Sequence, residues 1–273
     1  MFTQIHRTSP LLVSAVTLAM LMAQSTAQAT SITLNSTIRD FKISHPDFED
    51  GVSGVKTGLV GATLPANKNP TFVAANGSGA ITSSTTLSQW YDDVAGVNST
   101  TTSPLTLTET FSGSGIYAYN NSSFFPIDGQ LFGNQGNSHN YHFTLELHTT
   151  FTYLTGQTFN FTGDDDVWVY INNQLAMDLG GVHAAASGSV NLNTLGLTAG
   201  STYDFDFYFA ERHTTQSNLN IQTGIAFNPN PNPSPVPEPS SILLLSVGLA
   251  TLRLASKKKY KSTGAGFVIT HPA

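Results

Sequence analysis

The chain has no cysteine and few charged residues, and basic residues are scarcest in its central part. Without cysteine, neither a disulfide framework nor a thiolate metal site can form. Charged residues make up 10% of the 273 positions. Residues 30–235 carry 16 acidic and 5 basic residues, a net charge of −11. Such a surface excludes nucleic acid as a partner and favours metal cations and neutral sugars.

The N-terminus has the pattern of an export signal. His6 and Arg7 precede an apolar run over residues 11–22, which is followed by Ala27-Gln28-Ala29. A charged start, an apolar stretch and an Ala-x-Ala site are typical of a secretory signal peptide. We therefore predict a cleavable signal helix over residues 1–29 and export through the Sec pathway.

The C-terminal part changes composition after residue 227. Alternating proline predicts an extended linker over residues 228–239. Residues 240–261 hold an apolar run, 242–255, and then a cluster of lysines. A helix of that run is about 21 Å long, shorter than the ~30 Å hydrocarbon core. This predicts a short apolar helix that associates transiently with the inner membrane, followed by a disordered tail over residues 262–273.

Between these ends, apolar side chains alternate with polar ones at the strand period of 2. The alternation recurs at spacings near ten residues, with Gly, Asn and Ser between the runs. The runs are residues 105–109, 143–151, 167–171, 175–179, 203–209 and 219–227. They predict an all-β domain over residues 30–227, an antiparallel β-sandwich. One amphipathic helix is expected over residues 87–98, opened by Ser84 or Thr85 and ended by Gly96.

Three consecutive carboxylates stand at one turn between predicted strands. Asp164, Asp165 and Asp166 repel one another, so they need a cation or an open, solvated turn. Calcium accepts oxygen ligands in flexible geometry. Gly-Asp-Asp is also ordinary turn chemistry. A calcium site and a solvated turn both remain open.

The C-terminal segment resembles a PEP-CTERM sorting signal. The resemblance rests on Val236-Pro-Glu-Pro-Ser240, the short apolar run and the basic cluster, in that order. Residues 262–273 continue past the cluster, where such signals usually stop. The resemblance implies an exosortase-type processing enzyme as a partner. It also implies a bacterium that makes extracellular polysaccharide, with the protein at the cell surface or outside the cell after C-terminal processing.

The body resembles the fibro-slime domain family. The motifs that carry the resemblance are Ile38-Arg-Asp-Phe41, His45-Pro-Asp-Phe-Glu49, Gln89-Trp-Tyr91, Ser123-Phe-Phe-Pro-Ile-Asp-Gly129, His139-Asn-Tyr-His-Phe143, Phe161-Thr-Gly-Asp-Asp-Asp-Val-Trp-Val169, Asp178-Leu-Gly-Gly-Val-His183 and Phe209-Ala-Glu-Arg-His-Thr-Thr215. That family is related to the protective-antigen-like β-sandwich, which also forms the lectin head of fungal flocculins. There, two adjacent Asp residues joined by a cis peptide bind calcium, and sugar hydroxyls complete its shell. The same register implies Asp164 and Asp165 as the pair, with Asp166 in place of a glycine.

The resemblance also implies a second binding loop, which corresponds here to residues 211–218. Glu211 and Asn218 are candidate oxygen ligands within it. We add Asp178, His183, Arg212 and His213 as candidate ligand-binding residues near the site.

The resulting hypothesis is a non-enzymatic, calcium-dependent carbohydrate-binding or adhesion module of a cell surface, extracellular matrix or biofilm. Its ligand would be an extracellular polysaccharide or glycan. One alternative is a structural matrix protein without sugar binding. A glycoside hydrolase is disfavoured, because none of three adjacent Asp residues is set apart to carry a raised pKa.

Overall fold

The computed structural model describes residues 28–49, 53–73 and 80–229. The N-terminal signal helix, residues 230–239 of the linker, the short C-terminal helix and the tail that the sequence predicts lie outside these ranges, except residues 28 and 29 of the signal segment. Among the described residues, no helix is long and apolar enough to cross a bilayer. The elements are β1 (Ser31–Phe41), α2 (Ser84–Tyr91), β2 (Asn98–Glu109), β3 (Tyr117–Asn121), β4 (Phe143–Thr152), β5 (Thr158–Asp164), β6 (Asp166–Ile171), β7 (Gln174–Leu179), β8 (Ala186–Asn191), the short 3-10 helix η2 (Leu192–Thr194), β9 (Thr202–Glu211), β10 (Asn218–Thr223) and β11 (Phe227–Asn228).

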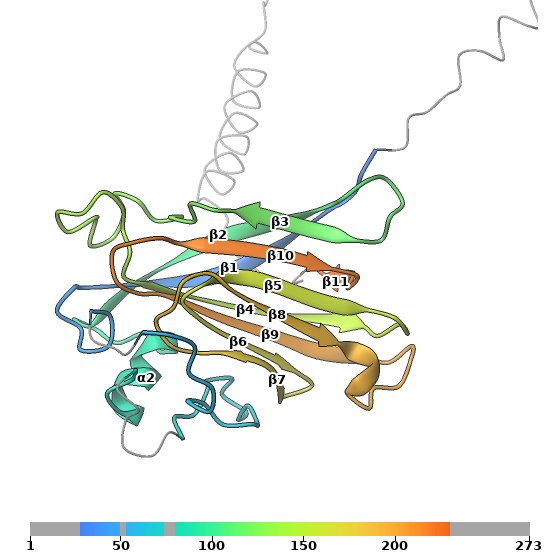
Figure 1. The fold of residues 1–273 in the computed structure, drawn as a ribbon, viewed down its shortest axis with the longest axis horizontal. Helices are drawn as coiled ribbons and strands as arrows, with labels where there is room; N and C mark the ends of the chain where they lie inside the picture. The colour runs from blue at the N-terminus through green and yellow to red at the C-terminus, as the bar shows by residue number, and fades with distance from the viewer. Residues whose placement is uncertain (1–27, 50–52, 74–79, 230–273) are drawn as a thin grey trace, which may run out of the picture. The chain divides into compact units, whose positions relative to one another are not determined.

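The strands form an antiparallel β-sandwich, as the sequence predicts (Figure 1). Hydrogen bonds connect them in the order β7-β6-β9-β4-β1-β2-β3-β10-β5-β8, and β11 pairs with β4. The ladder folds over on itself, so that strands far apart in this order meet face to face. Phe159 and Phe161 of β5 contact Phe207 of β9 across the interior, with ring centroids 6.4 and 5.8 Å apart.

The inward-facing residues of the alternating strands fill one core between the layers. Phe143, Leu145 and Leu147 of β4 lie in it, as do Val167 and Val169 of β6. All five are at most 2% exposed. The period-2 alternation therefore identifies the inner face correctly.

The outer face of β6, β9 and β4 is covered by residues 42–49, 53–73 and 80–97, which together we call the cover segment. Trp168 and Tyr170 of β6 and Tyr208 of β9 form a second core with Trp90 and Tyr91 of α2. The Trp90 and Trp168 rings lie 6.1 Å apart. The alternation over residues 167–171 predicts a strand buried on one face only, and this is wrong: the cover segment packs on the outer face, so β6 is buried on both faces.

The helix α2 differs from its prediction at both ends. It begins after Ser83, whose side chain accepts a hydrogen bond from the Thr86 backbone amide in a capping box. It ends at Tyr91 rather than near Gly96. Asn98 explains the early end, because its side-chain amide donates to the Gln89 and Asp92 carbonyls and its Oδ1 accepts from the Val94 amide.

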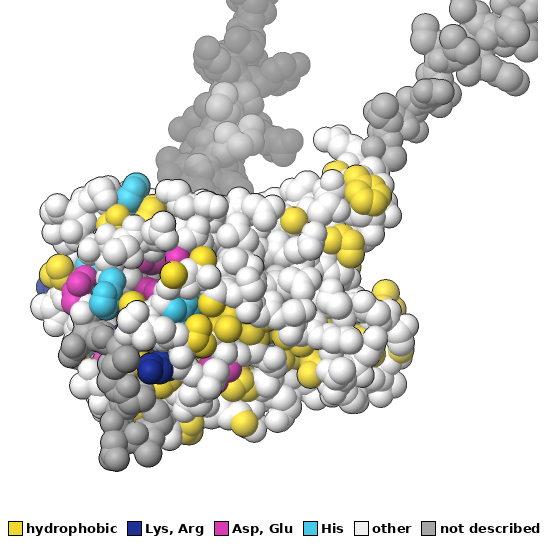
Figure 2. Space-filling view, viewed as in Figure 1, with side chains coloured by type: hydrophobic (Ala, Val, Ile, Leu, Met, Phe, Trp, Pro, Cys, Tyr) yellow, Lys and Arg dark blue, Asp and Glu magenta, His cyan; other side chains and the backbone are white. Residues whose placement is uncertain are grey.

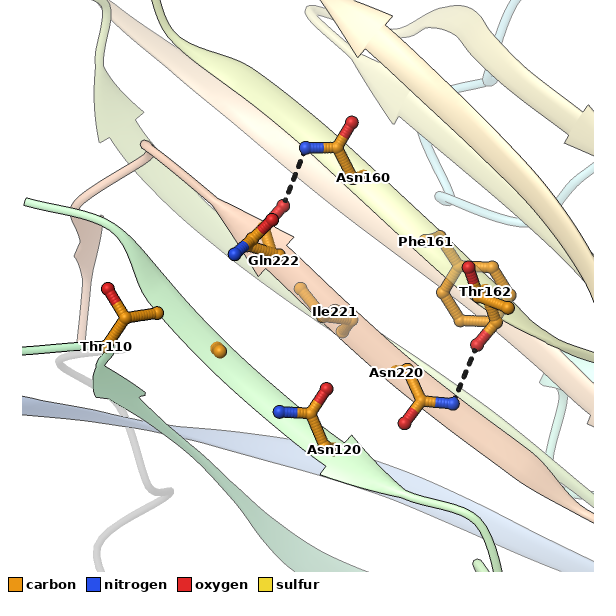
Figure 3. A pocket seen from close by; sticks show the side chains of 9 residues that line it. Thr110, Asn120, Asn160, Phe161, Thr162, Asn220, Ile221 and Gln222 are labelled. Carbon is orange, nitrogen blue, oxygen red and sulfur yellow. Dashed lines mark hydrogen bonds between the residues drawn. The ribbon is translucent and has the colours of Figure 1, made fainter.

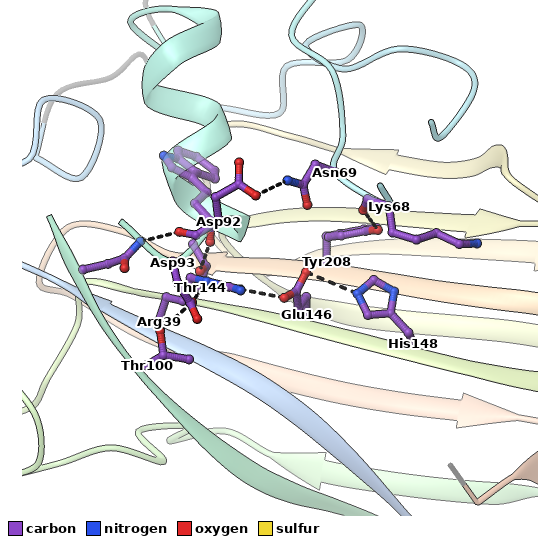
Figure 4. Close-up of polar contacts among 12 residues, drawn as sticks. Arg39, Lys68, Asn69, Asp92, Asp93, Thr100, Thr144, Glu146, His148 and Tyr208 are labelled. Atoms are coloured by element: carbon purple, nitrogen blue, oxygen red, sulfur yellow. Dashed lines mark hydrogen bonds and ion pairs between the residues drawn. The ribbon is translucent and has the colours of Figure 1, made fainter. Parts of the chain in front are cut away.

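Ion pairs also connect the cover segment to the sheet, and Figure 4 shows those of Arg39. Arg39 donates to Glu146 (2.6 Å) and to Asp93 at the end of α2 (2.8 Å). Lys68 of the cover segment lies 2.9 Å from Asp204 and 3.0 Å from Asp206 of β9. The cover segment is therefore held to the sheet by ion pairs as well as by apolar packing.

The opposite outer face, on β3, β10, β5 and β8, carries a different kind of side chain. Apart from Ala118 on β3 and Asp164 at the end of β5, its outward residues are Asn, Thr, Ser and Gln, most of them at least partly exposed. In Figure 2 the surface over β3 and β10 is almost free of charged side chains, whereas acidic and histidine side chains gather at one end of the molecule.

Candidate functional site

The acidic turn lies at one end of the sandwich, where four strand ends meet. β5 ends at Asp164 and β6 begins at Asp166, while β9 ends at Glu211 and β10 begins at Asn218. The peptide bond between Asp164 and Asp165 is cis. The fold thus brings together the three Asp residues and both ends of the predicted second loop.

Asp164 is bound to the start of β10. Its Oδ1 accepts a hydrogen bond from the Asn218 backbone amide (2.5 Å) and its Oδ2 accepts from Asn218 Nδ2 (2.8 Å). The side chain is 2% exposed. Asn218 therefore lies directly against the acidic turn.

Asp165 connects the turn to two other segments. Its Oδ1 accepts from the His183 backbone amide (2.8 Å) and its Oδ2 from the Arg212 backbone amide (3.1 Å). Burial, and next the charge of Asp166, raises the pKa of Asp165 to about 8. The site therefore disfavours a bare negative charge at Asp165. This raised pKa corrects the sequence-based expectation that none of the three Asp residues is set apart to carry one.

Asp166 has both oxygens engaged by the protein. Oδ1 accepts from the Gly181 amide (2.5 Å), and Oδ2 pairs with Arg212 Nη1 (3.1 Å). Neither side chain of the pair is exposed. The triple-Asp turn thus divides into an adjacent pair, Asp164 and Asp165, and a third residue that neutralises an arginine.

Arg212 also ties the site to the cover segment. Its Nε donates to the Asp47 carbonyl (2.8 Å) and its Nη2 to the Ala80 carbonyl (2.6 Å). The guanidinium carbon lies 5.4 Å from the Trp90 ring. The cover segment therefore fixes the residue that follows β9.

Glu211 has the least satisfied side chain of the site. It is fully buried, and within the described residues neither carboxylate oxygen has a hydrogen-bond partner. Burial, followed by the charge of Asp165, raises the pKa of Glu211 well above its usual value. An unpaired charge here would carry the full cost of desolvation.

Ser217 is a site residue that the sequence analysis did not single out. It is 1% exposed, and it partly offsets the raised pKa of Glu211, although the two side chains do not meet hydrogen-bond geometry. A serine in a polar loop carries no sequence signal of its burial. Only the turn of the chain between β9 and β10 places it beside Glu211.

The other predicted ligand-binding residues make structural contacts. Asp178 accepts from the Gly58 amide (2.7 Å) and from Trp168 Nε1 (3.0 Å). Each ring nitrogen of His183 lies near a backbone carbonyl, Ala184 at 2.9 Å and Leu179 at 3.1 Å. His213, at a φ of +60°, donates its amide to the Phe48 carbonyl.

The donor set at the turn fits a hard cation in its chemistry. Three carboxylates, of Asp164, Asp165 and Glu211, and the Asn218 amide oxygen are the ligand types that calcium takes. The unpartnered Glu211 oxygens supply acceptors that no protein donor uses. Across the residues that the structure describes, no group of three or more histidine and acidic side chains is already arranged as a metal centre.

Two family models match the chain. The model of the PA14 domain matches residues 122–237, and that of the PEP-CTERM protein-sorting motif matches residues 235–259. The PA14 match includes the acidic turn and the second loop. It begins after β1, the cover segment, β2 and β3.

Similar proteins are found in Dictyostelium discoideum. Protein psiR is 45% identical over 213 residues, which cover 72% of this chain and 21% of psiR. Protein psiC is 44% identical over 212 residues, which cover 71% of this chain and 41% of psiC. The chain thus spans less than half the length of these relatives.

Solved structures show a distant likeness. The PA14 sugar-binding domain from an RTX adhesin is 12% identical, with 72% of this chain and 93% of that chain covered and a TM-score of 0.32. The PA14 domain of the MpAFP antifreeze protein is 11% identical, with 41% and 65% covered and a TM-score of 0.27. The family models thus find a PA14 domain over residues 122–237 and a PEP-CTERM sorting motif after it, and the motif indicates export and processing at the C-terminal end.

Proposed function

We propose that this chain is an exported surface protein whose β-sandwich binds a glycan through a calcium ion held at the acidic turn. The observation that carries the proposal is the fully buried Glu211 carboxylate, which has no hydrogen-bond partner among the described residues. It lies at the junction that also contains Asp164, Asp165 and Asn218. Buried charges in proteins are normally paired or coordinate metals.

Asp164, Asp165, Glu211 and Asn218 would hold the ion. Calcium is a hard cation with flexible oxygen coordination, and ligands at strand ends are held by a rigid scaffold. The ion would supply positive charge to the carboxylates and open coordination positions to ligand hydroxyls. Asp166 is left out of this ligand set, because both of its oxygens are engaged by Gly181 and Arg212.

A glycan would reach the ion from the loop between β9 and β10. Thr214, Thr215 and Gln216 are exposed there and offer hydroxyl and amide groups. Trp168 and Tyr170 are fully buried beneath the cover segment, so neither is available to stack on a sugar ring. Recognition would therefore be polar and centred on the ion.

The proposal includes the route to the surface. We propose export through the Sec pathway, transient association of the C-terminal segment with the inner membrane and cleavage by an exosortase-type enzyme. The glycan partner would then be extracellular polysaccharide, and the body would be a fibro-slime domain. A binding role suits the site better than catalysis, because Asp164 and Asp165 are fixed by hydrogen bonds from the protein's own amides.

A glycan array in calcium and in EDTA tests the proposal. The purified full-length protein is expected to retain a subset of glycans in calcium and to lose them in EDTA. Glu211→Gln should lose the same glycans in calcium. Asp204→Asn, which removes a half-exposed carboxylate elsewhere on β9, should behave as wild type. Glycan retention by Glu211→Gln at the wild-type level would contradict the role of the site.

A structural matrix protein is the second candidate, and one observation favours it. The oxygens of Asp164 and Asp165 already accept hydrogen bonds from Asn218, His183 and Arg212, so the turn has internal partners without an ion. A folded wild-type protein that retains no glycan in calcium or in EDTA would support this candidate.

A further inference from the structure

Two rows of uncharged side chains, all polar except Ala118, cross the open face of the sandwich. Strand register aligns the members of the first row, which are Ser31, Thr108, Ala118, Gln222, Asn160 and Ser189. The second row, one step along the strands, is Asn120, Asn220, Thr162 and Ser187. Neighbouring strands lie about 4.8 Å apart, so the four strands β3, β10, β5 and β8 alone span about 14 Å. The rows therefore present donors and acceptors at a regular spacing.

A groove of about 310 Å³ lies between the rows (Figure 3). Ala118 stands in the first row, where a larger side chain would fill the space between β3 and β10. Asn120, Gln222 and Asn160 stand along the groove, and Phe161 and Ile221, whose side chains belong to the core, also line it. This volume is at the lower end of the range of small-molecule sites.

Hydrogen bonds orient the side-chain amides of Asn160 and Asn220 in the groove. Asn160 Nδ2 donates to the Gln222 carbonyl (3.3 Å), while its Oδ1 accepts from Ser189 Oγ (2.7 Å). Asn220 Nδ2 donates to the Thr162 carbonyl (3.2 Å), and its Oδ1 accepts from the Asn121 amide (3.2 Å). These side chains are held in place before any ligand arrives, which lowers the entropy cost of binding.

The other two side-chain amides of the groove, those of Asn120 and Gln222, are available to a ligand. Within the described residues, no hydrogen bond engages the side-chain amides of Asn120 and Gln222, and both residues are exposed. Each amide offers two donors and an acceptor. The groove thus combines fixed and available amide groups.

We propose that this groove is a second glycan-binding surface, which takes a neutral polysaccharide without calcium. Neither row contains an acidic or basic residue, so the groove offers no partner to a charged ligand. The net charge of −11 over residues 30–235 repels polyanions. Paired hydroxyls of an uncharged sugar chain match the alternating amides and hydroxyls of the rows. The groove is open and the rows continue past it, so a polysaccharide chain that is longer than the groove can bind.

Affinity electrophoresis of the full-length protein in EDTA tests this site apart from the acidic turn. The probes are hydroxyethylcellulose, dextran and galactomannan as neutral polysaccharides, with alginate as a polyanion. Retardation of the wild type by at least one neutral polysaccharide, and not by alginate, is expected. Glu211→Gln should be retarded equally, so failure of the calcium site would leave this result unchanged.

Two charge-matched variants decide whether the groove is responsible. Asn120→Asp/Gln222→Glu places two charges in the groove without removing a hydrogen bond of the described residues. Loss of its two amide contacts should weaken binding about tenfold. Asn35→Asp/Gln174→Glu adds the same charge at exposed positions outside the groove and should bind as wild type.

Three results would overturn the proposal. The first is a wild-type protein that no neutral polysaccharide retards in EDTA. The second is equal retardation of the groove variant and the wild type. The third is a dimer, seen by analytical ultracentrifugation, that the groove variant dissociates while glycan retardation is absent, because the face would then bind a second copy of this chain.

Discussion

The two outer faces of this sandwich are built on the same strand period but bear different chemistry. On β6 and β9 the outward residues include Trp168, Tyr170 and Tyr208, which the cover segment buries, and Asp204 and Asp206, which pair with Lys68. On β5 and β10, apart from Asp164 at the acidic turn, they are Asn, Thr and Gln, and they remain at least partly exposed. The inner faces of all four strands are similar, since each contributes to the same core. The outward residues therefore distinguish a covered face from an open one.

The cover segment explains why the acidic turn differs from a solvated loop. Through Asp47 and Ala80 it binds Arg212, which neutralises Asp166. The open face also reaches the turn, because Asn218 at the start of β10 donates to both oxygens of Asp164. The covered face thus positions Asp166 through Arg212, whereas the open face positions Asp164 and also presents a groove of its own.

The two faces should differ most in how much a substitution lowers the free energy of unfolding, and Trp168→Ala on the covered face should have the largest effect. This change removes a fully buried indole that packs on Trp90, and it should lower the free energy of unfolding by about 3–5 kcal/mol. Gln222→Ala on the open face should change it by no more than about 0.5 kcal/mol. Chemical denaturation of both variants measures the difference. Equal losses would show that the cover segment is not part of the folded core.

Arg212→Lys tests the connection between the cover segment and the site. The lysine keeps the charge beside Asp166 but cannot reproduce the guanidinium bonds to the Asp47 and Ala80 carbonyls. Two buried acceptors would lose their donor, so the free energy of unfolding should fall by about 1–3 kcal/mol. Protection of the Phe48 and Trp90 amides in hydrogen exchange should fall with it. Unchanged exchange in this region would argue against the link.

Ser83→Ala should weaken the cover segment more mildly. The substitution removes the side chain that caps α2 and should cost about 1 kcal/mol. Thr108→Ala, at an exposed position of the first row, is the matched control and should have a smaller effect. Thermal unfolding compares the two, and a smaller shift in Ser83→Ala than in Thr108→Ala would contradict the assigned cap.

The pH dependence of stability should differ between wild type and His148→Gln. Burial lowers the pKa of His148, but Asp206 and Glu146 outweigh it and raise the pKa to about 9. Because this pKa is higher in the folded state than its ordinary value of 6.5, the protonated ring stabilises the fold fully at pH values below about 6.5. This contribution is lost as pH rises from about 6.5 through 9. The melting temperatures of wild type and variant should therefore converge over that range, and a constant difference would refute the assignment.

Much of the fold can be predicted from local alternation, but the cover segment cannot. Residues 143–151 and 203–209 alternate clearly, and their inner faces lie where the alternation predicts them. The cover segment has no strand alternation, because outside α2 its described residues form mostly irregular chain whose apolar side chains are buried against β6 and β9. Burial of Trp168 and Tyr170 follows from that packing between distant parts of the chain.

At the site, the sequence identifies the carboxylates but not their individual partners. The three Asp residues are adjacent in the chain, and the strand ends that hold them determine that Asp166 faces Arg212 while Asp165 faces two backbone amides. The burial of Glu211 depends on the return of the chain from β9 to β10 through Ser217. The polar rows of the open face depend likewise on the register between β2, β3, β10, β5 and β8, which no single strand encodes.

Calorimetric titration of calcium into the metal-stripped full-length protein tests the central proposal most directly. We expect wild type and Asp204→Asn each to bind one equivalent and Glu211→Gln to bind none. Circular dichroism of the same samples establishes that all three are folded. A folded wild type that takes up no calcium, or a Glu211→Gln variant that binds it as wild type does, would contradict the assignment of the acidic turn as a calcium site.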